Sequence, residues 1–276
     1  MNIKTASLWQ WILLLIGSLF LAMVGYGLVG ATDEVLSSPV ATMIASLLLM
    51  GLYVLFVFLF EGERAQDVLR WRGFADTGLG LAVGALYFVV LVGLMLAIGC
   101  CSLERQAFNW PAQLRAFAMF LGVAVGEEIM FRGVLFRFID RRWGYWVALG
   151  VSALVFGLIH ISNDNATLWS SIAIAIEAGL LLGAAYKWSG TLWLPIGIHW
   201  AWNYTQGNIF GFAVSGNDAG ESLYQITTSG PDLLTGGDFG AEASLLSVVL
   251  GTAVSALFIW GYLRKSKAET LSRPTE

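Results

Sequence analysis

The sequence predicts an all-α fold, a polytopic membrane helix bundle, from three observations. First, the chain has 276 residues, of which 57% are hydrophobic and only 12% are charged. Soluble domains contain about 25% charged residues, so half that share indicates an integral membrane protein. Second, the mean hydropathy is high, at +0.72. Third, the hydrophobic runs are continuous and do not alternate with polar residues, which predicts membrane helices and not the strands of a β-barrel.

Eight segments are candidates for membrane-spanning helices, which need about 20 apolar residues. The expected spans are 8–30, 40–60, 78–99, 113–138, 145–162, 168–187, 191–210 and 243–263. The fourth span requires that its interior charges are tolerated. The seventh begins near Pro195, and proline is acceptable in a first helical turn. The first is longer than the apolar core of a signal peptide, about 7–15 residues, so we expect it to be retained.

Basic residues predict the orientation of the bundle, because they concentrate in cytoplasmic loops. With eight spans, 12 of the 15 Lys and Arg residues fall on one side, two fall on the other, and one lies within a span. The twelve are Lys4, Arg64, Arg70, Arg72, Arg137, Arg141, Arg142, Lys187, Arg264, Lys265, Lys267 and Arg273; the two are Arg105 and Arg115; the one within a span is Arg132. We therefore expect both termini in the cytoplasm and the Gly-rich, acidic segment 211–242 on the outer face.

The whole chain, residues 1–276, is expected to form a single integral membrane domain. It shows no internal repeat, low-complexity tract or second domain. The two cysteines, Cys100 and Cys101, are adjacent and have no other partner, so no intrachain disulfide framework is indicated. The net charge of −4 is small and gives no indication of a nucleic-acid partner. The lipid bilayer is the partner that the composition does predict.

Three charged residues interrupt the fourth predicted span, in the stretch VGEEIMFRGVLFRF (125–138). Glu128 and Arg132 are four positions apart and can pair along one helix face, which favours a structural role. Pairing matters because a charge at the bilayer centre costs about 2.5–3.5 kcal/mol on insertion scales. Glu127 points about 100° away from Glu128 around the helix and has no local cation. A buried carboxylate of this kind is suited to act as a general base for water.

Both histidines of the chain, His160 and His199, fall within predicted spans. Hydrogen bonding between helices is one interpretation, although ionisable residues at membrane depth are functional candidates by default. His199 and Asn203 share a helix face and could aim two donors at an oxyanion formed during acyl transfer. A polar patch that joins helices is the alternative. At a rise of about 1.5 Å per residue, Glu127 and both histidines can meet near the middle of the bilayer.

Glu127, His160 and His199 are also a candidate zinc-binding set. Histidine and carboxylate side chains bind zinc, and three protein ligands would leave a fourth position for water. The same residues suit hydrolysis without a metal, so the sequence leaves zinc open. It also leaves open whether Glu177, a further acid within a span, partners a polar group or lines the cavity. HExxH, nucleotide-binding and Gly-x-Ser-x-Gly motifs are absent, so those enzyme classes are not indicated.

Three motifs occur in order on separate predicted spans. They are Glu127-Glu128-x-x-x-Arg132, Phe156-x-x-x-His160 and His199-x-x-x-Asn203. The ordered set resembles the CPBP family of intramembrane proteases, which contains the CAAX prenyl endopeptidases and the bacterial Abi (lysostaphin-resistance-like) proteins. The resemblance covers about residues 113–205, which we expect to be the catalytic core.

The resemblance implies that an activated water hydrolyses a peptide bond within the membrane. Glu127 would be the base, and His160 would help to hold the water. His199 and Asn203 would stabilise the oxyanion, while Glu128 and Arg132 would brace the helix. The implied partner is a membrane-associated peptide or protein substrate, and the compact chain favours a bacterial plasma membrane.

Two other functions stay open from the sequence. A proton-coupled transporter would use Glu127, Glu177 and the two histidines as a relay, although the internal symmetry expected of transporters is not visible. A non-catalytic membrane partner protein would keep the fold without the chemistry. Variants of the charged residues distinguish these functions from hydrolysis.

Overall fold

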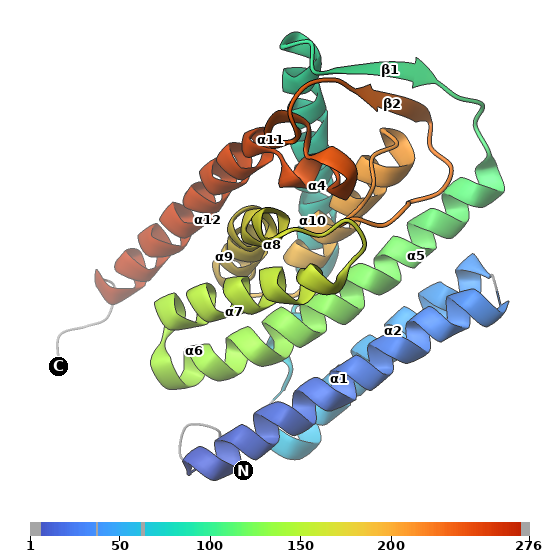
Figure 1. Cartoon of the computed structure of the whole chain (residues 1–276). Helices are drawn as coiled ribbons and strands as arrows, with labels where there is room; N and C mark the ends of the chain where they lie inside the picture. The colour runs from blue at the N-terminus through green and yellow to red at the C-terminus, as the bar shows by residue number, and fades with distance from the viewer. Residues whose placement is uncertain (1–6, 37, 62–63, 272–276) are drawn as a thin grey trace.

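The computed structural model describes residues 7–36, 38–61 and 64–271, so Lys4 and Arg273 of the orientation argument lie outside the described residues. Within that range the chain is a helical bundle with a short β-ribbon at one end (Figure 1). The helices are α1 (Leu8–Leu36), α2 (Pro39–Phe56), α3 (Gln66–Leu69), α4 (Gly73–Ala97), α5 (Trp110–Glu128), α6 (Arg137–Trp143), α7 (Tyr145–Ile159), α8 (Leu168–Ile174), α9 (Leu180–Ser189), α10 (Trp193–Tyr204), α11 (Asp232–Thr235) and α12 (Leu245–Leu271).

Four π-helical and three 3₁₀-helical segments continue or connect the described helices. The π-helical segments are η1 (Val57–Glu61), η2 (Ile129–Phe136), η4 (Ala175–Gly179) and η5 (Thr205–Ile209), and the 3₁₀ segments are η3 (His160–Ser162), η6 (Gly237–Phe239) and η7 (Ala241–Ala243). Helix α5 runs through η2 into α6 without a break, as the long rod across Figure 1 shows. Single π-helical turns inside α-helices are often found at functional sites.

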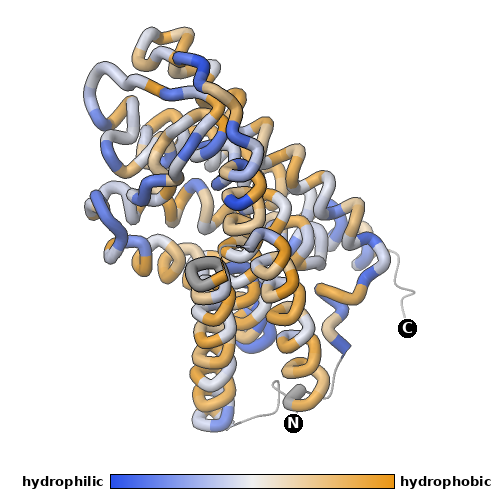
Figure 2. The backbone as a smooth tube through the Cα atoms, turned by 90° about the vertical axis from the view of Figure 1, so that its right-hand side faces the viewer, coloured by the Kyte–Doolittle hydropathy of each residue, from blue (hydrophilic) through white to orange (hydrophobic). Residues whose placement is uncertain are grey.

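Among the described residues, six helices are long and apolar enough to cross a membrane. They are Leu8–Thr32, Pro39–Leu59, Gly73–Ala97, Tyr145–Ser162, Leu168–Ser189 and Leu245–Leu271. These agree with six of the eight predicted spans, and Figure 2 shows hydrophobic residues along most of their length. The all-α polytopic bundle therefore fits the structure.

The other two predicted spans are helical as well, but each has a feature that sets it apart from the six. The α5–η2–α6 rod carries Glu127, Glu128 and Arg132 within its apolar stretch. Helix α10 has 12 residues and η5 adds five, so together they fall just short of an 18-residue helix. The total of eight spans consequently stays a prediction.

Local sequence signals set the ends of the helices that carry the site. Asn109 caps α5, since its side chain accepts a hydrogen bond from the Ala112 amide, and Pro111 lies in the first turn. Thr167 and Ser170 form a reciprocal capping box at the start of α8. Helix α9 ends at Gly190, whose φ of +70° is left-handed and favours glycine. These signals fix where each motif begins relative to its helix.

Helices α4 and α10 cross at unusually close range because glycines face the opposite backbone. A Cβ at Gly80 or Gly84 would overlap with the Leu194 and Ile198 carbonyl oxygens, respectively. Small residues of this kind let helix backbones approach closely in membranes. The crossing therefore holds the helix that carries His199 directly against α4.

The β-ribbon is a departure from the all-α prediction. Strand β1 (Cys101–Arg105) pairs antiparallel with β2 (Tyr224–Thr228), with Cys101 opposite Thr228. Each strand has only five residues. The segment 211–242, expected to be a Gly-rich loop, thus includes β2, α11 and η6 and folds back over the end of the bundle (Figure 1).

Candidate active site

A buried ion pair at the end of α5 is the first part of the site. The Arg132 Nη1 atom lies 2.8 Å from Glu128 Oε1, and both side chains are completely buried. Arg132 Nη2 also donates to the Gly179 carbonyl oxygen at 3.2 Å, and the guanidinium lies 4.6 Å from the Phe156 ring centre. The predicted pairing along the helix is therefore present, and it connects α5–η2 to α7 and η4.

His199 lies between the two glutamates. Its Nδ1 is 2.9 Å from Glu128 Oε1, the same oxygen that binds Arg132. Its Nε2 is 3.9 Å from Glu127 Oε2. Because a carboxylate only accepts hydrogen bonds, Nδ1 carries the proton that it shares with Glu128. Glu128 thus fixes the orientation of the ring so that Nε2 faces Glu127.

Glu127 lies on a different side of the helix from Glu128 and has a different set of neighbours. Tyr26, on α1, lies beside the Glu127 side chain. Gly126 has no side chain at the point where the Tyr26 ring packs, and a Cβ there would overlap with the ring. Within the described part of the chain, Glu127 Oε2 is buried and has no hydrogen-bond partner. This oxygen is the one that faces His199.

His160 lies at the end of α7, inside the apolar helix Tyr145–Ser162 that agrees with the predicted span 145–162. It is the C-cap residue of α7, and its Nδ1 lies 2.6 Å from the Phe156 carbonyl oxygen. Because a carbonyl only accepts hydrogen bonds, Nδ1 is the protonated nitrogen and Nε2 of a neutral ring has a lone pair. The hydrogen bond therefore joins Phe156 and His160, the two residues of the second motif, which are one helical turn apart.

A small cavity brings His160, His199 and Asn203 together. Its volume is about 20 Å³, and about 10–15 Å³ is enough to hold a water molecule. Its wall is formed by Phe156, His160, Ile174, Ala178, Leu182, His199, Trp202, Asn203, Ser215 and Glu242. Glu127 is not part of this wall, but its carboxylate faces Nε2 of His199, which is. The cavity has room for about one water molecule between the second and third motifs.

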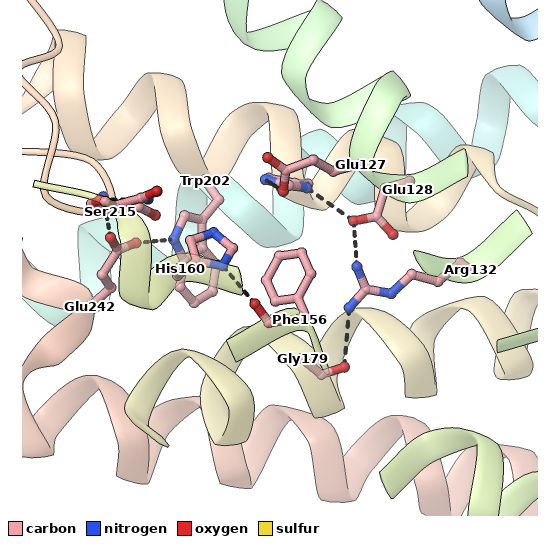
Figure 3. A network of polar contacts seen from close by, with 11 residues as sticks. Glu127, Glu128, Arg132, Phe156, His160, Gly179, Trp202, Ser215 and Glu242 are labelled. Carbon is pink, nitrogen blue, oxygen red and sulfur yellow. Dashed lines mark hydrogen bonds and ion pairs between the residues drawn. The ribbon is translucent and has the colours of Figure 1, made fainter. Parts of the chain in front are cut away.

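Glu242 and Ser215 are residues of this cavity that the sequence did not predict. Both lie in the segment that follows α10, and Figure 3 shows them beside His160, on the other side of the Phe156 ring from Arg132. The Glu242 carboxylate accepts hydrogen bonds from the Ser215 amide and from Trp202 Nε1. Burial raises the pKa of Glu242 above its ordinary value, while His160 and the two donors oppose that shift.

Trp202 and Glu177 are both buried and have defined neighbours. Trp202 is buried, and its ring stacks on Tyr87 with ring centres 4.1 Å apart. Glu177 is completely buried and does not line the cavity. Tyr87 donates to its carboxylate at 3.2 Å, and the Ser247 hydroxyl donates to the same oxygen. Of the two roles left open for Glu177, the structure supports partnership with polar groups.

Zinc binding by Glu127, His160 and His199 stays a prediction. Among residues 7–36, 38–61 and 64–271, no group of three or more His, Cys, Asp or Glu side chains is placed to hold a metal ion. The Nδ1 atoms of His160 and His199 are bound to Phe156 and Glu128, so only their Nε2 atoms remain for a metal. We therefore derive no chemical step through a metal.

Comparison with known proteins shows which family the segment that carries this site is similar to. Residues 109–205 match the model of the type II CAAX prenyl endopeptidase Rce1-like proteins. The resemblance to the CPBP family is confirmed. The Rce1-like segment contains all six site residues predicted from the sequence: Glu127, Glu128, Arg132, His160, His199 and Asn203.

One curated relative is similar to part of the chain. The uncharacterized protein YpbD of Bacillus subtilis (strain 168) is 32% identical over 97 residues, which are 35% of this chain and 46% of the relative. The match thus spans less than half of the relative's length. The Rce1-like segment ends at residue 205, so Ser215 and Glu242 lie beyond it.

Proposed function

We propose that this protein is an intramembrane endopeptidase that hydrolyses a peptide bond of a membrane-associated peptide or protein. The observation that supports this most directly is the position of His199, held by Glu128 at Nδ1 and facing Glu127 Oε2 at 3.9 Å through Nε2. A carboxylate and an oriented imidazole at this separation are close enough to act on the same substrate group. The Rce1-like match supports the same class of reaction.

Glu127 acts as the general base in the proposed mechanism. Its Oε2 takes a proton from water, and the hydroxide forms a bond to the carbonyl carbon of the scissile peptide. When the C–N bond breaks, the proton passes from Glu127 to the departing amine. Tyr26 lies beside the Glu127 side chain and, in this mechanism, helps to keep Oε2 directed at His199. His160, whose Nε2 has the free lone pair, helps to hold the water.

His199 and Asn203 stabilise the oxyanion that forms on the carbonyl oxygen. Because the Nδ1 proton of His199 is shared with Glu128, Nε2 donates to the oxyanion only when the ring is an imidazolium. Glu128 and Arg132 brace the ring and the helix. Since the cavity is about 20 Å³ in volume, a substrate enters only after its wall moves, and the segment that carries Ser215 and Glu242 is the part we expect to move.

The proposal includes a location and an orientation. The chain crosses the plasma membrane of a bacterium eight times as one integral domain, with residues 113–205 as the catalytic core. Both termini lie in the cytoplasm and the segment 211–242 lies outside. The basic residues support this orientation, and six apolar helices support the multi-pass arrangement.

The Glu127→Gln variant tests the proposed base. We expect cleavage to fall by roughly 10²–10⁴-fold, the usual contribution of a general base, while folding is retained. The full-length protein in liposomes would be incubated with prenylated CAAX-type peptides and with a library of membrane-tethered peptides, and the products would be identified by mass spectrometry. Glu221→Gln, which changes an exposed acid, is the matched control.

Each outcome of this experiment distinguishes the alternatives. A folded Glu127→Gln protein that cleaves at the wild-type rate would refute the proposed base. Proton-coupled flux across the liposomes that is lost in the variant, with no cleavage in the wild type, would support the transporter. Metal analysis of the purified protein, with chelation during cleavage, tests zinc directly: stoichiometric zinc and loss of activity on chelation would contradict the metal-free mechanism.

A further inference from the structure

A groove between α4 and α12 lies apart from the candidate active site. Its volume is about 480 Å³, larger than that of the cavity between the histidines. Its walls are apolar: α4 contributes Val83, Leu86 and Val90, and α12 contributes Leu250, Val254 and Leu257. We call it the α4–α12 groove. In Figure 1, α12 runs along one side of the bundle to the C-terminus, so the groove opens sideways.

The length of the groove matches one leaflet of a bilayer. Along α12 its wall extends from Leu250 to Gly261, which at 1.5 Å per residue is about 16 Å. One leaflet is half of the hydrocarbon core of about 30 Å, that is, about 15 Å. An apolar wall of this length fits one extended acyl chain lying parallel to the helix.

The end of the groove nearest the C-terminus is aromatic and positively charged. Trp188 and Trp260 form the wall there, and tryptophan is enriched at the level of lipid head groups. Lys265 Nζ lies 4.4 Å from the Trp188 ring centre, and the Arg264 guanidinium lies 4.1 Å from the Trp260 ring centre. Both cations are exposed. A ligand whose chain fills the groove therefore places its head group against two positive charges.

One residue of the groove wall on α4 carries a hydroxyl group. This residue is Tyr87, and its hydroxyl is held by the Ser247 backbone carbonyl at 2.7 Å and by Glu177 at 3.2 Å. The groove and the cavity between the histidines share none of their lining residues. The groove is therefore a separate site from the cavity between the histidines.

We propose that the α4–α12 groove is a binding site for an anionic phospholipid. One acyl chain lies between α4 and α12, and the phosphate group lies against Arg264 and Lys265. Clusters of Lys and Arg beside apolar helix surfaces bind anionic lipids in this way. The inference goes beyond the proposed function, because the site is distinct from the hydrolytic residues.

Native mass spectrometry of the full-length protein in detergent tests the site. The probes are dioleoyl phosphatidylglycerol, dioleoyl phosphatidylcholine and glycerol phosphate, each titrated separately. We expect phosphatidylglycerol to bind about tenfold or more tightly than phosphatidylcholine, and glycerol phosphate to bind weakly, because each cation near the surface adds to the attraction. The Arg264→Ala/Lys265→Ala variant should remove the preference, and Val254→Trp should weaken both phospholipids equally by filling the groove.

The control is Arg105→Ala, which removes an exposed cation on β1, away from the groove. It should leave both affinities unchanged. Equal affinity of the wild type for the two phospholipids would overturn the proposal, as would an unchanged preference in Arg264→Ala/Lys265→Ala. Detection of a dimer that Val254→Trp abolishes would also overturn it, since a second copy of the chain would then be the occupant. If Val254→Trp does not fold, the exposed double variant still decides the result.

Discussion

At the scale of single residues, one carboxylate oxygen organises the candidate site. Glu128 Oε1 binds both Arg132 and His199, so the charge of one arginine and the orientation of one imidazole depend on the same atom. Glu128 Oε2 and Arg132 Nε are buried without hydrogen-bond partners in the described part of the chain. A buried ion pair that leaves polar atoms unsatisfied is weak support for stability. We infer that the pair is kept for geometry.

A double-mutant cycle on this pair tests that inference. Arg132→Met should lower the free energy of unfolding by about 3–5 kcal/mol, because it leaves Glu128 buried without its cation. Glu128→Gln/Arg132→Met should recover most of this loss, since neither charge remains. Reversible unfolding in mixed micelles measures both, with exposed Arg105→Met as the control. An equal loss in the single and double variants would contradict the inference.

The residues of the site were predictable to different degrees. The pairing of Glu128 with Arg132 was predicted from their spacing of four along a helix. The common direction of His199 and Asn203 was predicted from the helix face that they share. The bond between Glu128 and His199 was not predictable, because it joins residues 71 positions apart. Glu242 gave no signal, since an acid in a Gly-rich acidic segment has the composition of an ordinary surface loop.

At the scale of elements, the crossing of α4 and α10 determines where His199 lies. Gly84 faces the carbonyl of Ile198, the residue before His199. A side chain at Gly84 would have to push α10 away from α4. Because misplacing a catalytic group by about 1 Å can cost on the order of 100-fold in rate, this contact is expected to matter for catalysis as well as packing.

Gly84→Ala should therefore destabilise the fold by about 1–3 kcal/mol, the usual cost of overpacking, and reduce cleavage by at least tenfold. Gly93→Ala is the matched control on the same helix, because a Cβ at Gly93 meets nothing within 4 Å. It should be neutral or stabilising by up to about 1 kcal/mol. Thermal unfolding and cleavage rates of the two variants, compared side by side, check this. Equal effects would show that the close crossing is not needed.

The elements themselves were largely predictable, and their exceptions have physical causes. Long apolar runs indicate helices because the backbone must be satisfied within lipid, and six such runs became long apolar helices. The β-ribbon was missed because its two short strands are more than 100 residues apart in the chain. The π-helical segments were missed because they depend on packing between helices and have no local pattern.

At the scale of the whole molecule, the proposed orientation can be measured with cysteine labelling. The two native cysteines are buried, and burial raises the pKa of both thiols. Since the thiolate is the reactive form, a raised pKa makes labelling near neutral pH slow. Labelling of the two native cysteines should therefore be weak, so Cys100 and Cys101 do not have to be replaced before the experiment.

We expect Asp218→Cys to react with a membrane-impermeant maleimide in intact cells, because Asp218 is exposed in the segment proposed to lie outside. Lys267→Cys, exposed near the end of α12, should react only after the membrane is permeabilised. The wild-type chain is the control for background. Reaction of Lys267→Cys in intact cells would reverse the proposed orientation or change the number of spans.

The cavity wall has two origins, since the histidines belong to the Rce1-like segment while Ser215 and Glu242 follow it. The residues proposed to hydrolyse the peptide bond therefore lie in one stretch of the sequence. The residues expected to move when a substrate enters lie in another. Substitutions in the stretch that carries Ser215 and Glu242 can therefore arise without changes in the Rce1-like segment. Exchange of residues 206–244 between homologues should accordingly transfer the choice of target while the rate of hydrolysis stays with the recipient.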